Sequence, residues 1–525
     1  MRHGPVKWWC HEARRDDKEI KRRGGIFAGE NRLHTLRAVD FFRHSSWRGS
    51  EVRVGIDEHD SSRANNRFDA SGLRIHMIGI GGCGMSGAGR ILAERGAVVS
   101  GSDLNSFEGM GSLVQRGVKV SIGHRAEQVA EDVDLVVISA AIPMSNPELQ
   151  IAHRRGVRVI KYAELLGELS RGYRGIAIAG THGKSTTTAM VAHIFRESGL
   201  DPTFVIGAQS EQLGGSSAAG TGPHFVVESC EYGRSFLNLK PHAAAILNIE
   251  SDHLDCYKNF EAIVEAFSDF ARLVDVAGIV ICNGEDRWAM EASAASGACV
   301  ETFGFDESVD WRAINLAQDF GRFSFDVQYR RVPVLSTRLE VPGQHNVRNV
   351  LAAVALAYHC GAACHRISEA VTSFEGIGRR LTLRGRGSGV QIVDDYAHHP
   401  TEIRVTIEAV RSRYVPKRII VVFQPHQYDR TRHFLDDFAA SFHDVDEVVV
   451  PDVYGARESE RDGVQVGSKE LVSRICEKGG RACYLPTLSA AAEHVVAQAT
   501  DGDLVVTMGA GDVWKVADEL VQRIC

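Results

Sequence analysis

The chain has 525 residues, of which 44% are hydrophobic and 24% are charged, a balance typical of a soluble globular protein of about three domains. Its net charge of −7 excludes a general affinity for nucleic acid. No apolar run approaches the roughly 18 residues that span a bilayer, and the first residues lack the apolar stretch of a secretory signal. We therefore expect a cytoplasmic protein without membrane insertion.

Residues 1–72 differ in composition from the rest of the chain. They hold 15 Lys and Arg against 11 Asp and Glu, a net charge of +4, and their hydrophobic periodicity is poor. The interleaved acidic residues argue against the alternative of a basic tail that binds anionic partners. We expect an N-terminal extension that is disordered and dispensable.

The first regular pattern begins at Arg74, in a predicted domain of residues 73–172. A strand, a glycine-rich turn, a helix and a second strand come first, and further strands are expected at 134–139 and 157–160. Short apolar runs that alternate with helical stretches indicate a parallel sheet covered on both faces.

The glycine-rich turn fits the spacing GxGxxG, and an acidic residue ends the next strand. The glycines are Gly79, Gly81, Gly82 and Gly84, and the acidic residue is Asp103. Glycine there lets the backbone approach a pyrophosphate, and the acidic residue could hold a ribose. The motif alone leaves open an NAD-dependent dehydrogenase or tight strand–helix packing without a ligand.

A second domain is predicted over residues 173–376, with strands at 175–180, 224–229, 243–249 and 278–283. The first of these strands runs into GTHGKSTTT, a turn shorter than the GxxxxGK[ST] pattern. Backbone N–H groups can surround phosphate in such a turn, and its lysine adds a positive charge. The predicted nucleotide-binding residues are Gly180, Thr181, His182, Gly183, Lys184, Ser185 and Thr186.

Acidic residues follow two neighbouring strands of this domain. Glu228 and Glu231 end one strand, and Glu250, Asp252 and His253 follow another. Residues at the carboxyl ends of parallel strands face the ligand crevice, so these side chains are candidates for binding Mg²⁺ beside the Ser185 hydroxyl.

A third domain is predicted over residues 377–525, with strands at 390–396, 418–425, 447–453 and 503–509. The fold class is therefore α/β, with three consecutive Rossmann-like or P-loop-like parallel-sheet domains. The eleven cysteines are scattered without a CxxC pair, so their spacing suggests neither a zinc site nor a disulfide framework.

Nine stretches in order resemble the Mur ligase superfamily, the ATP-dependent amide-forming enzymes of peptidoglycan synthesis. They lie at residues 76–87, 101–105, 180–188, 248–257, 342–353, 374–380, 393–402, 423–432 and 509–512. The similarity covers about residues 74–525 and is strongest to the branch that adds L-alanine to UDP-N-acetylmuramate through an acyl phosphate. The alternatives are a related ligase with another amino acid or peptide substrate and a nicotinamide-dependent oxidoreductase.

The resemblance also implies roles for individual residues, with ATP and Mg²⁺ as cofactors and UDP-N-acetylmuramate and L-alanine as substrates. The glycine turn, Ser86 and Asp103 would bind the UDP-sugar. Ser185, Glu228 and His253 would ligate Mg²⁺. The catalytic residues would be Lys184, His253, His398 and Arg430. Three further residues would bind ATP: Asn346 its adenine, Arg380 its phosphates and Asp394 its ribose. Helix capping is the alternative for Asn346.

Three departures from the family pattern bear on these roles. Cys230 replaces an acidic residue that relatives commonly have, although Glu228 is retained. Gln427 replaces an arginine found in many relatives, which puts part of the amino-acid pocket in doubt. Residues 259–273 contain no lysine, as in the alanine-adding branch.

Overall fold

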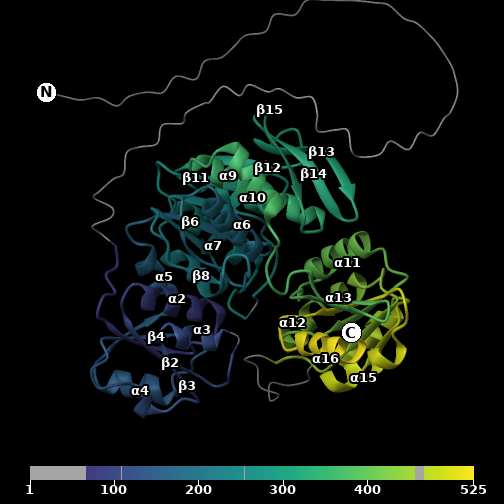
Figure 1. Cartoon of the computed structure of the whole chain (residues 1–525), viewed down its shortest axis with the longest axis horizontal. Helices are drawn as coiled ribbons and strands as arrows, with labels where there is room; N and C mark the ends of the chain where they lie inside the picture. Colours follow the sequence, from purple (N-terminus) through teal and green to yellow (C-terminus); the bar gives the residue numbers. More distant parts are fainter. Residues whose placement is uncertain (1–66, 108, 254, 456–465) are drawn as a thin grey trace, which may run out of the picture. The chain divides into compact units, whose positions relative to one another are not determined.

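The computed structural model describes residues 67–107, 109–253, 255–455 and 466–525. Within them the chain forms three sheets in succession, each with its own helices (Figure 1). The predicted α/β class with three consecutive domains is confirmed. The expectation of disorder for residues 1–72 falls outside the described residues up to position 66. Among the described residues, no helix is long and apolar enough to cross a bilayer.

The first sheet has five parallel strands in the order β3-β2-β1-β4-β5. This order places the carboxyl ends of β1 and β2, and the turns that follow them, at one edge of the sheet. Its elements are β1 (Arg74–Ile78), α2 (Cys83–Glu94), β2 (Val98–Asp103), α3 (Met110–Gln115), β3 (Lys119–Ile122), β4 (Leu135–Ile138), α4 (Pro147–Arg154), β5 (Arg158–Lys161) and α5 (Tyr162–Ser170).

The second sheet has ten strands in the order β15-β14-β13-β12-β11-β10-β6-β9-β7-β8. Its first part comprises β6 (Arg174–Ala179), α6 (Lys184–Glu197), β7 (Thr203–Val205), β8 (Ser217–Ala218), β9 (His224–Glu228), β10 (Ala243–Ile246), α7 (Phe260–Arg272), β11 (Ile279–Asn283) and α8 (Arg287–Ser293). Its second part comprises β12 (Cys299–Gly304), β13 (Trp311–Asp319), β14 (Arg322–Tyr329), β15 (Val332–Leu339), α9 (Gln344–His359) and α10 (Cys364–Ser373).

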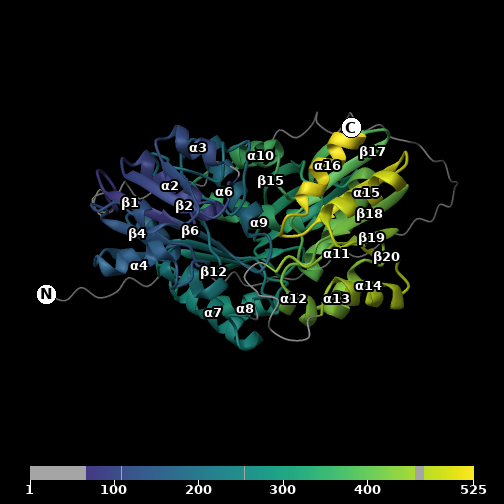
Figure 2. The same ribbon diagram turned by 90° about the horizontal axis from the view of Figure 1, so that it is seen from below.

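The third sheet has the order β16-β17-β21-β18-β19-β20, and β16 is its antiparallel edge. Its elements are β16 (Thr382–Gly387), β17 (Val390–Asp395), α11 (Pro400–Tyr414), β18 (Arg418–Phe423), α12 (Tyr428–His433), α13 (Leu435–Ser441), β19 (Glu447–Val450), α14 (Ser468–Glu477), β20 (Ala482–Tyr484), α15 (Leu488–Gln498), β21 (Asp503–Met508) and α16 (Trp514–Ile524). Figure 2 shows α15 and α16 on one face of this sheet and α13 and α14 on the other.

The strands expected from apolar runs all form, but the second sheet is not purely parallel as predicted. Strands β13, β14 and β15 make an antiparallel meander at its edge. Residues of this meander alternate between buried and exposed positions, so it lacks the continuous apolar runs of a strand buried on both faces. Because continuous apolar runs indicate only strands that are buried on both faces, the sequence did not predict this meander.

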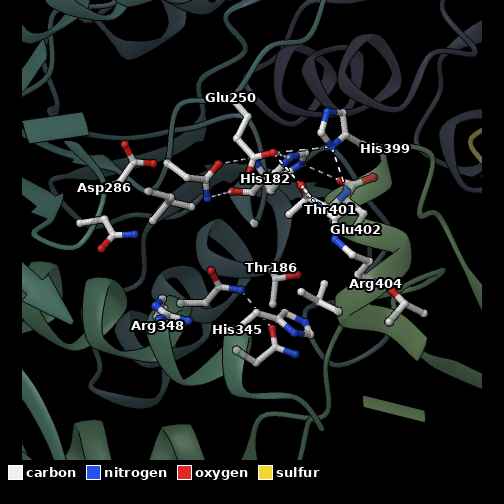
Figure 3. A pocket seen from close by; sticks show the side chains of 18 of the residues that line it. His182, Thr186, Glu250, Asp286, His345, Arg348, His399, Thr401, Glu402 and Arg404 are labelled. Atoms are coloured by element: carbon white, nitrogen blue, oxygen red, sulfur yellow. Dashed lines mark hydrogen bonds and ion pairs between the residues drawn. The ribbon is translucent and has the colours of Figure 1, made fainter. Parts of the chain in front are cut away.

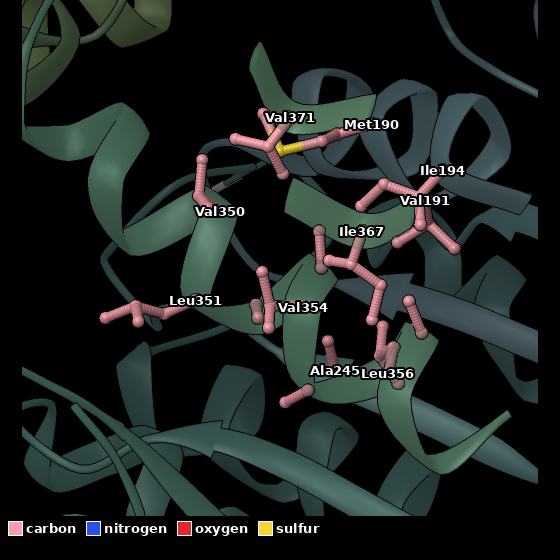
Figure 4. Close-up of a cluster of buried hydrophobic side chains, with 14 of the residues drawn as sticks. Met190, Val191, Ile194, Ala245, Val350, Leu351, Val354, Leu356, Ile367 and Val371 are labelled. Atoms are coloured by element: carbon pink, nitrogen blue, oxygen red, sulfur yellow. The ribbon is translucent and has the colours of Figure 1, made fainter. Parts of the chain in front are cut away.

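A buried cluster of aliphatic side chains packs α6, α9 and α10 against the second sheet (Figure 4). Val191 and Ile194 come from α6, Val354 from α9 and Ile367 from α10, and each is fully buried. Burial of one such side chain stabilises the fold by about 1.5–3 kcal/mol. This core holds the amino end of α6, and the turn before it, in a fixed position.

Candidate functional site

The turn between β6 and α6 depends on two glycines with positive φ. Gly180 has φ +148° and Gly183 has φ +82°, conformations that side chains with a Cβ rarely adopt. A Cβ on Gly183 would lie 2.6 Å from the Asn349 Oδ1 atom. The helix α6 begins directly after this turn, at Lys184, so its free backbone N–H groups and positive dipole end face the turn.

Lys184 lies folded over this turn. Its Nζ donates to the Gly180 carbonyl at 2.5 Å and to the Thr181 carbonyl at 3.0 Å, and it lies 2.9 Å from Glu231 Oε2. Burial disfavours the ammonium, but the neighbouring Glu231 carboxylate outweighs burial and raises the pKa of Lys184. Lys184 is therefore a fixed positive charge at the turn, and Glu231 is its counter-ion.

The three candidate metal ligands lie around this lysine. Ser185 is buried in the first turn of α6, and the Glu228 carboxylate accepts a hydrogen bond from Gly207 N at 2.6 Å. His253 has φ +55°, and its Nε2 lies 3.5 Å from Glu231 Oε1. Glu231 thus connects Lys184 with His253, a role that the sequence reading did not assign to it.

A second polar cluster lies on the other side of the turn, around His182 (Figure 3). The His182 Nδ1 lies 3.1 Å from Glu402 Oε1, and its Nε2 lies 3.6 Å from Glu250 Oε2. Thr401 donates to the same Glu250 oxygen at 2.7 Å. The His399 ring packs on His182 with centroids 4.7 Å apart. The cluster joins the second sheet's loops to the start of α11, and sequence reasoning gave no role to Glu402.

The opposite charges of His182, Glu250 and Glu402 stabilise one another. Burial disfavours the imidazolium, but the two flanking carboxylates outweigh it and raise the pKa of His182 to about 9. Burial disfavours the charged form of Glu250 as well, which by itself would raise its pKa. The His182 and Thr401 side chains outweigh burial and lower the pKa of Glu250 to about 2. At neutral pH a charged His182 therefore lies between two carboxylates.

This arrangement predicts a dependence of stability on pH. A raised pKa means that the charged His182 contributes its full stability below pH about 6.5 and loses it as the pH rises through about 9. The rise of the His182 pKa from about 6.5 to about 9 corresponds to about 3 kcal/mol in the free energy of unfolding. We expect the free energy of unfolding of wild type to exceed that of His182→Asn at pH 6.5, and the difference to shrink by pH 10.

Urea unfolding at both pH values measures this difference. The exposed His443, replaced in His443→Asn, is the control and is expected to change nothing. An equal gap between wild type and His182→Asn at the two pH values would contradict the ion-pair role.

A cavity of about 800 Å³ adjoins the turn. Its lining includes Gly183, Thr186, Asn346, Arg380 and Asp395, which come from the second and third sheets and their loops. Its size suits a ligand as large as a nucleotide. Thus several residues predicted to bind the nucleotide share one cavity.

Asn346 lies inside the first turn of α9 and is not its cap, because the helix begins at Gln344 after Gly343. Its Nδ2 donates to the Pro342 carbonyl at 2.7 Å, and its Oδ1 accepts from Asn349 at 3.0 Å. The capping alternative for Asn346 is therefore wrong. These bonds hold the amide at the cavity wall.

The structure does not bring Asp394 to the cavity. Its carboxylate accepts from Arg379 Nε at 2.9 Å and from Thr507 Oγ1 at 2.7 Å, and it is 1% exposed. The next residue, Asp395, lines the cavity instead. Successive side chains of a strand point to opposite faces, so Asp395 faces the cavity and Asp394 faces away from it. The ribose contact expected from the sequence was for Asp394. Burial raises the pKa of Asp395 to about 6.

His398 and Arg430 come from the loop after β17 and from α12. Arg430 makes two hydrogen bonds to Asp252 Oδ1, from Nε at 3.1 Å and from Nη2 at 2.7 Å. Both partners are buried. His398 Nδ1 lies 2.9 Å from the Tyr396 carbonyl oxygen, and burial lowers the pKa of its ring to about 4. His398 is therefore neutral near pH 7, and Arg430 is tied to the loop that carries His253.

The glycine turn of the first sheet is closed by its own acidic residue. Gly81 N donates to Asp103 Oδ2 at 2.8 Å. A Cβ on Gly84 would lie 2.3 Å from the Tyr162 hydroxyl, so a larger residue there would have to displace the Tyr162 side chain. The Ser86 hydroxyl donates to the Cys83 carbonyl at 2.9 Å. Of the predicted residues, Gly79, Gly81 and Gly82 lie in the turn before α2, Gly84 and Ser86 lie in the first turn of that helix, and Asp103 ends β2 beside them. Tyr162 is a neighbour that sequence spacing could not reveal.

Three family models match the chain in succession. The model described as the Mur ligase family catalytic domain matches residues 74–174, the Mur ligase middle domain matches 178–357, and the Mur ligase glutamate ligase domain matches 379–511. Together they cover most of the region that contains the three sheets.

Curated proteins and solved structures show the same similarity. The UDP-N-acetylmuramate–L-alanine ligase of Caldanaerobacter subterraneus is 40% identical over 452 residues, which are 86% of this chain and 97% of that protein. The protein of the same name from Acetivibrio thermocellus is 41% identical over 85% of this chain and 94% of its own length. The crystal structure of UDP-N-acetylmuramate-alanine ligase from Thermotoga maritima aligns with a TM-score of 0.74 at 28% identity, over 86% of this chain and 99% of that chain.

Proposed function

Because the chain belongs to the Mur ligase family, we propose that it is an ADP-forming ligase that joins L-alanine to UDP-N-acetylmuramate in peptidoglycan precursor synthesis. Relatives of that name match it at 40% identity over nearly their whole length. The observation that carries the proposal is the charged Lys184 over the glycine turn beside a nucleotide-sized cavity. Its substrates are ATP, UDP-N-acetylmuramate and L-alanine, and its compartment is the cytoplasm.

The chemistry requires activation of a carboxylate before the amide can form. The sugar carboxylate attacks the γ-phosphorus of ATP, the bond to the ADP oxygen breaks, and an acyl phosphate results. The alanine amine then attacks the acyl carbon, phosphate leaves, and the amine loses a proton. Lys184 and the N-terminus of α6 stabilise the negative charge that accumulates on the transferring phosphoryl group.

The donor set around Lys184 fits a magnesium ion. Mg²⁺ prefers oxygen ligands and keeps several waters, and the Ser185 hydroxyl and the Glu228 carboxylate supply oxygen at the turn. Ser185, Glu228 and His253 would hold the ion. When bound, it would neutralise charge on the phosphates. Glu231 would orient both His253 and Lys184, because its carboxylate contacts each of them.

We further propose that Asn346 contacts adenine, Arg380 contacts phosphate, and Asp395 rather than Asp394 contacts ribose. The support for these roles is that Asn346, Arg380 and Asp395 line the cavity, whereas Asp394 is paired with Arg379. The turn from Gly79 to Ser86, closed by Asp103, would hold the UDP-sugar. The proposed domains are residues 73–172, 173–376 and 377–525, each of which contains one sheet.

Phosphate release with UDP-N-acetylmuramate, MgATP and one amino acid at a time tests this function. We expect turnover with L-alanine. Turnover only with a tripeptide or with glutamate would instead favour a related ligase with another substrate. Thermal protection by NAD, but not by UDP-N-acetylmuramate, would favour the oxidoreductase alternative.

Removal of one metal ligand provides a separate prediction. We expect His253→Ala to raise the Mg²⁺ concentration for half-maximal ligation by about tenfold or more, because one ligand is lost. Activity measured across a Mg²⁺ titration shows this shift. The exposed His365, replaced in His365→Ala, is the matched control. A titration curve unchanged by His253→Ala would remove this residue from the ligand set.

A further inference from the structure

Three side chains that can bind metal meet in the third sheet, outside the site described above. They are Glu447 at the start of β19, Cys483 in β20 and His494 in α15. His494 Nε2 lies 2.8 Å from Glu447 Oε1 and 3.8 Å from Cys483 Sγ. One ligand atom from each lies within 4.8 Å of those of the other two.

The strand register explains this meeting. β19 and β20 are parallel, with Val449 opposite Cys483. Side chains two residues apart on a strand point to the same face, so Glu447 lies on the face of Val449 and Cys483. That face is covered by α15, which contributes His494. Three different elements therefore present one ligand each to the same point.

The carboxylate of Glu447 is incompletely satisfied. Glu447 is 5% exposed, and its Oε2 atom is buried without a hydrogen-bond partner among the described residues. Leaving such an oxygen unpaired is unfavourable, because it has lost its water without gaining a partner. A divalent cation would satisfy the oxygen and replace the thiol proton.

We propose that Glu447, Cys483 and His494 bind one zinc ion, with a water molecule as the fourth ligand. Thiolate, imidazole and carboxylate are the ligands that Zn²⁺ uses in proteins. Around a tetrahedral metal these atoms lie about 3.5 Å apart, so the spacing of Cys483 and His494 already fits. Glu447 has to move away from His494 by about half an ångström. His494 is partly exposed, which leaves room for the water.

The site lies apart from the residues of the ligation reaction. Glu447 is the first residue of β19, whereas the loops with His398 and Arg430 follow the last residues of β17 and β18. In the register of the parallel strands Glu447 is level with Ile420 of β18, and Cys483 is level with Val422. The cluster therefore lies within the strands on the face covered by α15, whereas His398 and Arg430 lie beyond the ends of β17 and β18. The ion would tie the edge strand β20 to β19 and α15.

Cobalt binding to the full-length protein, freed of metal with a chelator, tests the proposal. Bound at Cys483, Co²⁺ gives a thiolate-to-metal charge-transfer band in the near ultraviolet. The other three-residue cluster found among the described residues, His182, Glu250 and His399, has no sulfur and cannot give this band. We expect one equivalent of Co²⁺ to produce the band and an equivalent of Zn²⁺ to abolish it by displacement.

Variants decide which residues bind. Cys483→Ser and His494→Gln should weaken binding at least 100-fold, as should Glu447→Gln, while ligation of alanine continues and reports that they fold. Cys476→Ser is the matched control, because Cys476 lies on α14, which packs on the other face of β19. Absence of the band in wild type, or a band retained in Cys483→Ser, would overturn the proposal and leave a plain Glu447–His494 ion pair.

Discussion

Lys184→Ala is expected to reduce ATP-dependent ligation by about 1,000-fold or more while UDP-N-acetylmuramate still binds. The lysine is a fixed charge at the turn, held by two carbonyls and Glu231. Removal of one group that stabilises transition-state charge typically costs 100- to 1,000-fold in rate. Here the loss also leaves the buried Glu231 carboxylate without the cation that it pairs with.

Two measurements separate these effects. Phosphate release reports catalysis, and isothermal titration with UDP-N-acetylmuramate reports the first domain, whose glycine turn lies at the start of a different helix, α2. The exposed Lys258, replaced in Lys258→Ala, is the control. If Lys184→Ala keeps appreciable ligation, the charge at this turn does not act on the phosphoryl group.

The second large effect is expected at Arg430. Its two hydrogen bonds to Asp252 join α12 of the third sheet to the loop that carries His253. Removal of one partner of a buried ion pair costs about 3–5 kcal/mol. That figure is a loss of stability, and the effect on catalysis comes from the loop that the arginine no longer holds. Because a misplacement of about 1 Å can cost about 100-fold in rate, we expect Arg430→Ala to lower kcat/KM for L-alanine by roughly a hundredfold.

The comparison with Asp252→Asn shows how Arg430 acts. If the arginine also holds the alanine carboxylate, Arg430→Ala should raise KM for L-alanine clearly more than Asp252→Asn does. The exposed Arg432, replaced in Arg432→Ala, is the control. Equal effects of the two variants, with an unchanged KM for L-alanine, would show that Arg430 only positions the loop. A wild-type kcat/KM in Arg430→Ala would contradict both roles.

The departures noted in the sequence lie close to these residues. Cys230 occupies the position between Ser229 and Glu231 and is exposed, so the counter-ion of Lys184 does not depend on an acid there. Gln427 precedes α12 with φ +70°, and its N–H donates to the Tyr454 carbonyl at 2.9 Å. The residue that replaces an arginine of many relatives therefore lies at the turn that places Arg430.

Sequence alone determined the features that depend on neighbours along the chain. The apolar runs predicted the buried strands, and the spacing of Gly180, Gly183 and Lys184 predicted the turn between β6 and α6. These features are local: a turn of given length needs glycine where φ is positive, and a helix that begins there exposes its N–H groups. The order of motifs along the chain likewise indicated the family.

Only the tertiary structure decided which side chains meet across separate elements. Glu231 pairs with Lys184, Glu402 with His182, and Arg430 with Asp252. Strand register and loop packing bring these partners together over separations of 47 to 220 residues, and no spacing along the chain records them. The face of β17 on which each side chain lies decided that Asp395, and not Asp394, lines the cavity. The register of β19 and β20 brought Glu447 and Cys483 together beside His494.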